Sequence, residues 1–395
     1  MDTCCQKSSA CPSSTSAATA GDPFAWFARM IPNCLEHARA AQEAGRPVVG
    51  IMCEFAPREL ILAAGGVPVC LCGGSAAMIP PAEEHLPVNL CPLVKSTYGY
   101  HVKQANPFLE MADLIIAETT CDGKKKMIEL LAERRPVHML ELPQQPDESG
   151  ALERLLEEFR KLKAVLEEKF AVEICDARLR DAIRAMNRER ALRRELAMLL
   201  ASPTPPLTGR QLLDLKSSIS AIPADFAQYE AILRLLREQS PCPGMAGRVR
   251  VLLTGVPVPH GAERVVDLIE NSGGLIVAQE NCTGLKPILD DVDETAPDPL
   301  RALAEKYLHL PCSVMAPNTR RFTMLRDLAA TYHPDCIIEL VWQACLTYDI
   351  ESQRVRRLAE ELSLPYLRIE TDYSPSDNER IRVRVEALYE TVRAS

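Results

Sequence analysis

From Arg46 onward, short apolar runs alternate with segments of helical periodicity. The runs "RPVVGIM", "VPVCLCGG", "DLIIAETT" and "PVHMLELP" are β-rich, whereas "APRELILAAGG" and "GKKKMIELLAERR" have the spacing of amphipathic helices. Strands that are separated by single helices favour right-handed parallel crossovers. The pattern therefore predicts a doubly wound parallel sheet in the first part of the chain.

The strand signal disappears between residues 151 and 240. Apolar side chains recur there at steps of three and four residues, which places them on one face of a long helix. They are Leu152, Leu155, Leu156, Phe159, Leu162, Leu166 and Phe170. We predict a second helix from Asp176 to about Ala201 and a third over "PADFAQYEAILRLLREQ". This part of the chain is expected to be a helical connector.

The alternation resumes at "RVRVLLTGVPV" and continues to the C-terminus. The segment from Asp335 to Ser374 repeats the order of the segment from Asp113 to Leu142: an apolar strand, a cysteine, a helix and another strand. Such an internal repeat indicates two related units. We predict an α/β protein with two related doubly wound (Rossmann/flavodoxin-like) domains, at residues 22–150 and 246–395, joined by a connector at residues 151–245.

The chain begins with a Ser/Thr/Ala-rich segment, residues 1–21, that lacks an apolar core. We expect this segment to be a disordered tail and not a signal peptide. The composition of the whole chain, 47% hydrophobic and 25% charged, is typical of a soluble globular protein. No apolar run approaches the roughly 20 residues of a membrane span. A net charge of -9 makes nucleic acid an unexpected partner, and we expect a cytoplasmic protein.

The chain contains 15 cysteines, an odd and unusually high number. Without export, the compartment is expected to be reducing, which disfavours a disulfide framework. Thiols at this density then point to metal binding or redox chemistry.

Six of the cysteines form two sets of three on the predicted elements. Each set lies at the ends of predicted strands and in one proline-containing loop: Cys53, Cys91 and Cys121 in the first half, Cys282, Cys312 and Cys345 in the second. Ligands of open α/β sheets bind at the carboxyl ends of the strands, so each set can converge on one crevice. The absence of Cys-x-x-Cys pairs disfavours structural zinc and favours iron-sulfur ligation. Buried structural thiols are the alternative.

The other nine cysteines are expected to have no ligand role. Cys70 and Cys72 form a C-x-C pair on one predicted strand, where they would share a face and pack in the core. The rest lie in the tail, in helical stretches, in a linker or inside a strand: Cys4, Cys5, Cys11, Cys34, Cys175, Cys242 and Cys336.

Several motifs together resemble the 2-hydroxyacyl-CoA dehydratase and benzoyl-CoA reductase superfamily. They are "MCEFAPRELILAAGGVP", "NLCPLVKSTYG", "ETTCDGKKKM", "ENCTG", "QACLTYDIES" and "IETDYS". The resemblance covers almost everything from Asp22 to the C-terminus. A cysteine set in both halves is most similar to the double-cubane cluster proteins of this superfamily.

This resemblance implies a double-cubane [8Fe-9S] cluster. Cys53, Cys91 and Cys121 would hold one cubane, and Cys282, Cys312 and Cys345 the other. It also implies a homodimer that receives low-potential electrons from a separate ATP-dependent [4Fe-4S] reductase. The chain itself contains no G-x-x-x-x-G-K-[ST] motif for nucleotide phosphates, which agrees with ATP use by the partner.

The resulting prediction is an iron-sulfur oxidoreductase that reduces a small-molecule substrate. One alternative is a 2-hydroxyacyl-CoA dehydratase subunit, a lyase with one [4Fe-4S] cluster, and another is a non-catalytic electron-transfer protein. Glu54, Glu118, Glu280 and His260 are candidate proton donors near the predicted ligands, but cap or loop hydrogen bonds for the glutamates, and a partly exposed loop position for His260, are the favoured interpretation. Catalytic residues are therefore left unassigned. The basic "GKKK" segment suits cluster charge compensation, partner docking or a solvated helix face.

Overall fold

A computed structural model describes residues 22–238 and 244–394 of the chain. The predicted tail, residues 1–21, lies outside the described residues, as do Cys4, Cys5, Cys11 and Cys242. None of the helices in the described ranges is long and apolar enough to cross a membrane.

The fold contains two four-stranded sheets in which all paired strands are parallel. The first sheet has the order β2-β1-β3-β4 and the second has the matching order β6-β5-β7-β8. The strands are β1 (Val48–Ile51), β2 (Val67–Cys70), β3 (Leu114–Glu118), β4 (Val137–Leu140), β5 (Val249–Gly255), β6 (Gly274–Glu280), β7 (Cys336–Trp342) and β8 (Tyr366–Thr371). The predicted α/β class with two doubly wound units is confirmed.

Every residue of β3, β6 and β7 is buried, which explains why these strands are mostly apolar in sequence. Helices lie between and around the strands: α1 (Pro23–Ala28), α2 (Met30–Glu43), α3 (Arg58–Ala63), α4 (Ile79–Glu83), α5 (Pro92–Lys103), α6 (Pro107–Met111), α7 (Asp122–Ala132), α12 (Arg264–Asn271), α13 (Pro299–Leu308), α14 (Thr319–Tyr332), α15 (Leu346–Glu361) and α16 (Asn378–Ala394). Both faces of each sheet are therefore covered.

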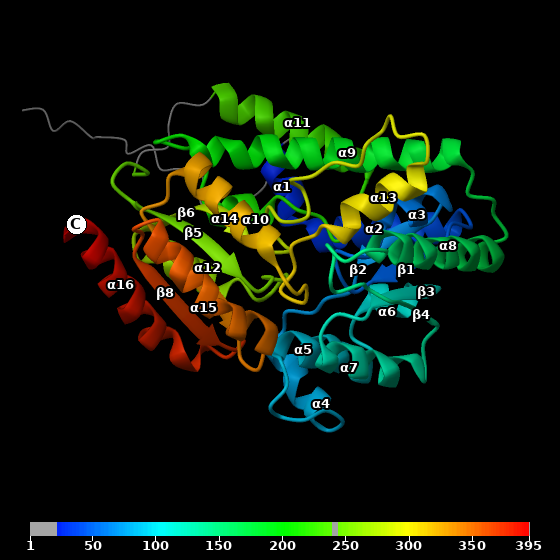
Figure 1. Ribbon diagram of the computed structural model, residues 1–395, viewed down its shortest axis with the longest axis horizontal. Coiled ribbons are helices and arrows are strands. Elements are labelled where there is room, and N and C mark those ends of the chain that lie inside the picture. Colours follow the sequence, from blue (N-terminus) through cyan, green and yellow to red (C-terminus); the bar gives the residue numbers. More distant parts are fainter. Residues whose placement is uncertain (1–21, 239–243, 395) are drawn as a thin grey trace, which may run out of the picture.

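The middle of the chain is helical, as its periodicity predicts. It contains α8 (Ala151–Phe170), α9 (Asp176–Met198), α10 (Gly209–Asp214) and α11 (Pro223–Glu238). Five of the seven residues on the predicted face of α8 are at most 1% exposed: Leu155, Leu156, Phe159, Leu162 and Leu166. Figure 1 shows α9 running along the same side of both sheets.

The two halves are not packed independently. Helix α13 belongs to the second half in sequence, but it packs on α8 and α9 of the connector. Its residues Leu303 and Tyr307 belong to the same core as Leu60 of α3 and Phe159 of α8. The domain limits 22–150, 151–245 and 246–395 remain a prediction. The core shared by α3, α8 and α13 contains residues from all three of these segments.

Candidate iron-sulfur site

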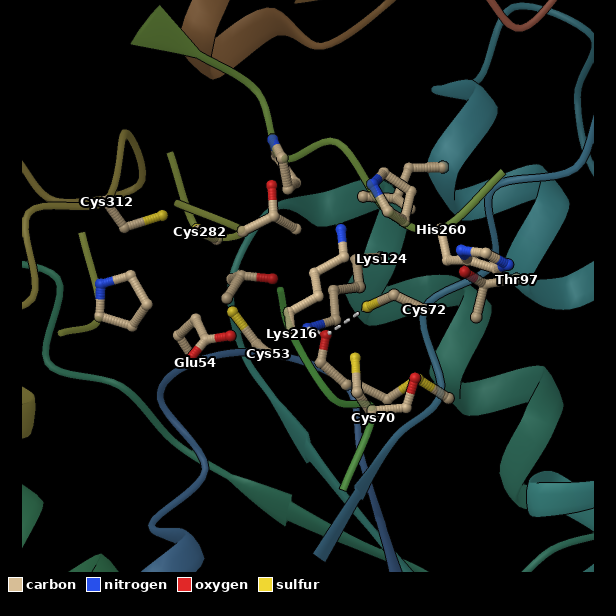
Figure 2. Close-up of a pocket in the computed structure, with 18 of the residues that line it drawn as sticks. Cys53, Glu54, Cys70, Cys72, Thr97, Lys124, Lys216, His260, Cys282 and Cys312 are labelled. Carbon is tan, nitrogen blue, oxygen red and sulfur yellow. Dashed lines mark hydrogen bonds between the residues drawn. The ribbon is translucent and has the colours of Figure 1, made fainter. Parts of the chain in front are cut away.

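A cavity of about 260 Å³ lies between the two halves, at the carboxyl ends of the strands. All six predicted ligand cysteines line it: Cys53, Cys91, Cys121, Cys282, Cys312 and Cys345. Figure 2 shows the thiols of Cys53, Cys282 and Cys312 arriving from separate segments of the chain. Residues that are more than 290 positions apart in the sequence therefore reach one cavity, as the strand pattern predicts.

Three of the six thiols stand at the start of a helix. Cys91, Cys121 and Cys345 are the residues that directly precede α5, α7 and α15. The positive end of a helix dipole stabilises a nearby thiolate, which is the form of cysteine that binds metal. The other three lie in loops: Cys53 after β1, Cys282 after β6 and Cys312 after α13.

Contacts between the thiols cross from one half to the other. The thiols of Cys345 and Cys91 interact, which lowers the pKa of Cys91 and raises that of Cys345. Cys121 also interacts with both of these residues. In the same way, Cys53 interacts with Cys282 and Cys312.

Burial dominates the electrostatics of the other thiols. It raises the pKa of Cys53 to about 12 and also raises the pKa of Cys121 and Cys282. Thiolates in such surroundings require a positive charge nearby, which a bound metal supplies.

Within the described ranges, no group of three or more His, Cys, Asp or Glu side chains is arranged to hold one metal ion. In a structural zinc site, four ligands meet on one ion. In an iron-sulfur cluster each thiolate binds a different iron, so the sulfurs stand further apart. Six converging thiols of this kind fit a cluster better than a single ion.

Two of the four candidate proton donors reach the cavity. Glu54 lines it and pairs with Arg58 at 2.9 Å, and His260 lines it with a largely exposed ring. Glu118 and Glu280 are fully buried in ion pairs with lysines and do not line the cavity.

The basic residues singled out in the sequence differ in burial and in their distance from the cavity. Lys124 is largely buried and lines the cavity, whereas Lys125 and Lys126 are exposed on the same helix. Lys95 is buried away from the cavity, where it pairs with Glu83 at 2.7 Å. Of the "GKKK" lysines, Lys124 alone is placed to act on the cysteines.

The structure adds cavity residues that the sequence pattern did not identify. Cys70 packs against the core as expected, but both it and Cys72 also line the cavity. Lys216, from the connector, lines it too, and burial lowers its pKa to about 8. The C-x-C spacing was the sequence signal that could have identified the two thiols as cavity residues. Lys216 follows ordinary helix residues, and no sequence signal marks it.

Other cysteines lie where the sequence suggested. Cys34 and Cys336 are buried, in α2 and at the start of β7, and Cys175 is exposed at the start of α9. None of these three lines the cavity.

Comparisons with known proteins agree with the resemblance seen in the motifs. The chain is 39% identical over 354 residues to the putative dehydratase subunit YjiM of Escherichia coli (strain K12), covering 88% of this chain and 92% of that protein. It is 25% identical over 357 residues to lactoyl-CoA dehydratase subunit beta of Anaerotignum propionicum, covering 88% and 92% of the two chains. It is 23% identical over 364 residues to the (R)-phenyllactyl-CoA dehydratase beta subunit of Clostridium sporogenes, covering 89% and 93%.

The family model described as "2-hydroxyglutaryl-CoA dehydratase, D-component" matches residues 53–392, a span that begins at the first cavity cysteine and includes every strand of both sheets except β1. Most of the chain is therefore accounted for by one family. The protein belongs to the 2-hydroxyacyl-CoA dehydratase family.

Proposed function

We propose that this protein is an iron-sulfur reductase that holds a double-cubane [8Fe-9S] cluster and reduces a small molecule. One observation carries the proposal: the cysteine sets of both halves line the same cavity. A family member with a single [4Fe-4S] cluster needs only three thiolates. Six thiolates in one cavity suit a cluster with two cubane units.

The thiol contacts favour a particular division of the ligands. Cys91, Cys121 and Cys345 interact with one another, and Cys121 also interacts with Cys312; we assign the first three to one cubane unit. Cys53, Cys282 and Cys312 form the second group. This division mixes the two halves, unlike the half-by-half division that the resemblance implies.

When bound, the cluster supplies low-potential electrons to a substrate in the cavity. The protein surrounds this space with charged groups and buried thiols and leaves Glu54 and His260 at its edge. We assign these two side chains as the first candidates for proton delivery, because both reach the cavity. Glu118 and Glu280 are excluded from that role by their buried ion pairs with Lys124 and Lys286.

The proposal includes a partner that delivers the electrons. We propose a separate ATP-dependent [4Fe-4S] reductase, together with a homodimer of the present chain. The lack of a phosphate-binding motif in this sequence supports ATP use by another protein.

A second candidate function is a 2-hydroxyacyl-CoA dehydratase subunit with one [4Fe-4S] cluster. The names of the relatives favour it, since they include lactoyl-CoA and (R)-phenyllactyl-CoA dehydratase subunits. A non-catalytic electron-transfer protein would hold the same thiols but would not turn over a substrate.

Iron and acid-labile sulfide analysis of anaerobically purified protein tests the proposal. About eight irons per chain support the double cubane, and about four support the single-cluster dehydratase. Zinc without iron would refute both. The Cys345→Ser variant should lose half or all of the iron, whereas Cys336→Ser, which alters a buried thiol outside the cavity, should retain it.

A further inference from the structure

Each half of the molecule contains a buried lysine–glutamate pair beside its cysteines. Glu118 is the last residue of β3, and its Oε2 lies 2.9 Å from Nζ of Lys124. Glu280 is the last residue of β6, and its Oε1 lies 2.8 Å from Nζ of Lys286. Both glutamates are fully buried, and the lysine side chains are 13% and 2% exposed. Such buried charges are expensive unless they are paired.

The two pairs share a sequence spacing that encloses a predicted ligand. In each, the lysine follows the glutamate by six residues, and Cys121 or Cys282 lies between them. The repeat of the fold does not explain this match, because β3 is an inner strand of its sheet whereas β6 is an edge strand. The same spacing thus occurs on two strands that are not equivalent, which indicates a requirement of the site. The pairs differ in that Glu280 also pairs with the buried Arg321 at 3.2 Å.

Each lysine presents its positive charge to the cavity thiols. Lys124 also donates to the carbonyl oxygen of Met52 at 3.0 Å, next to Cys53. Lys124 lines the cavity with Cys53, whereas Glu118 does not, so the lysine is the end of the pair that faces the thiols. The same lysine acts on Cys72 and Cys121.

The second pair acts on the other half of the site. Lys286 opposes the effect of burial at Cys282 and donates to the hydroxyl oxygen of Tyr348 at 3.0 Å. Tyr348 itself lines the cavity. Both lysines are therefore held by a carboxylate on one side and by a second oxygen on the other, with their ammonium groups fixed in position.

We propose that Lys124 and Lys286 are the buried counter-charges of the cysteine site and set how readily it accepts an electron. The inference rests on the proposed function, because it concerns the cluster assigned above. A nearby positive charge stabilises the more negative, reduced state, so its removal disfavours reduction. The glutamates keep the lysines charged and oriented, and they act in the opposite direction on the thiols.

Substitution of either Lys124 or Glu118 tests the role of the first pair. Lys124→Met should lower the midpoint potential of the bound cluster in a spectroscopically monitored redox titration, and Glu118→Gln should raise it. A tenfold change in electron affinity corresponds to about 59 mV for a one-electron couple. The double variant should return toward the wild-type value. Lys125→Met, on the exposed side of the same helix, is the matched control and should leave the potential unchanged.

A purely structural role predicts a different result. If the pair only holds the loop in place, Lys124→Met and Glu118→Gln should change the potential in the same direction or only reduce the iron content. Either outcome overturns the inference. Lys124→Arg keeps the charge and should preserve the potential, which separates loss of charge from poor folding. The same set, applied to Lys286 and Glu280, tests the second pair.

A readout on iron-free protein separates this inference from the proposed function. Wild-type protein that binds no iron after anaerobic reconstitution would refute the proposed function alone. The charge effect is then measured as the rate of iodoacetamide labelling of Cys53, located by mass spectrometry. Lys124→Met should slow the labelling and Glu118→Gln should accelerate it, because a thiolate is the reactive form. Equal rates in both variants would refute the counter-charge role.

Discussion

Replacing Arg190 by methionine is expected to destabilise the folded chain by about 3–5 kcal/mol, the typical result of removing one partner of a buried ion pair. Arg190 of α9 donates to Glu59 of α3, and the hydroxyl of Tyr307 in α13 donates to the same carboxylate at 2.8 Å. All three side chains are at most 3% exposed. The variant would leave the Glu59 charge buried between three helices, with the hydroxyl of Tyr307 and the more distant charge of Lys306 to stabilise it.

Urea unfolding followed by circular dichroism measures this loss. With a slope of about 3 kcal/mol per molar urea, the midpoint should fall by roughly 1 M or more. The control is Arg184→Met, which removes an exposed pair with Asp181 on the same helix and should change the free energy of unfolding by less than about 1 kcal/mol. Equal effects of Arg190→Met and Arg184→Met would refute the reasoning.

The pH dependence gives a second check on the same pair. Burial would raise the pKa of Glu59, but the charge of Arg190 and its hydrogen bond hold it below the ordinary value. A depressed carboxyl pKa stabilises the fold at neutral pH, and that stability is lost as the pH falls through the folded pKa. Without Arg190, burial raises the pKa of Glu59 instead. The difference between variant and wild type should therefore shrink on acidification.

Three further predictions concern other parts of the molecule. The neighbouring Cys72 thiol lowers the pKa of Cys70 to about 7, so Cys70 should be labelled by iodoacetamide near neutral pH in iron-free protein. Cys72→Ser should move this labelling to higher pH, and an unchanged profile would contradict the influence of Cys72. Burial raises the pKa of Asp225 to about 6, so the charge of Asp225 weakens the fold increasingly from pH 4 to 7. Asp225→Asn should stabilise the folded protein at pH 7 by at most about 3 kcal/mol. Thermal unfolding should show little gain from this variant near pH 4. Gly99→Ala would place a Cβ 1.8 Å from the carbonyl oxygen of Met78 and should lower stability by about 1–3 kcal/mol in urea titrations; wild-type stability would show that the backbone can yield there.

The fold could be predicted because its strongest signals are local. Buried parallel strands such as β3 and β7 are apolar at most positions, so they stand out without any knowledge of their neighbours. The apolar stripe of α8 is equally visible, since Leu155, Phe159 and Leu162 recur at helical spacing. The packing of α13 on α8 could not be predicted, because nothing in either helix specifies its partner.

Only the part of the candidate site that lies at the ends of strands could be predicted from the sequence. Cys53 and Cys121 follow apolar runs directly, and the carboxyl edge of a parallel sheet is the expected place for ligands. The contact between Cys91 and Cys345 depends on how the two halves face each other, which no short pattern encodes. Lys286 was missed because a lysine in a loop is ordinarily solvated, and its burial results from tertiary packing.

The sulfur contact between Cys91 and Cys345 also bears on how such a protein is made and how it moves. Each of the two groups of interacting thiols draws cysteines from both halves, so an isolated half would lack ligands for the cluster. Any hinge rotation of one sheet against the other would alter the spacing of these sulfurs before it disturbed either sheet. Loading of the cavity and the relative orientation of the halves should for this reason be thermodynamically linked.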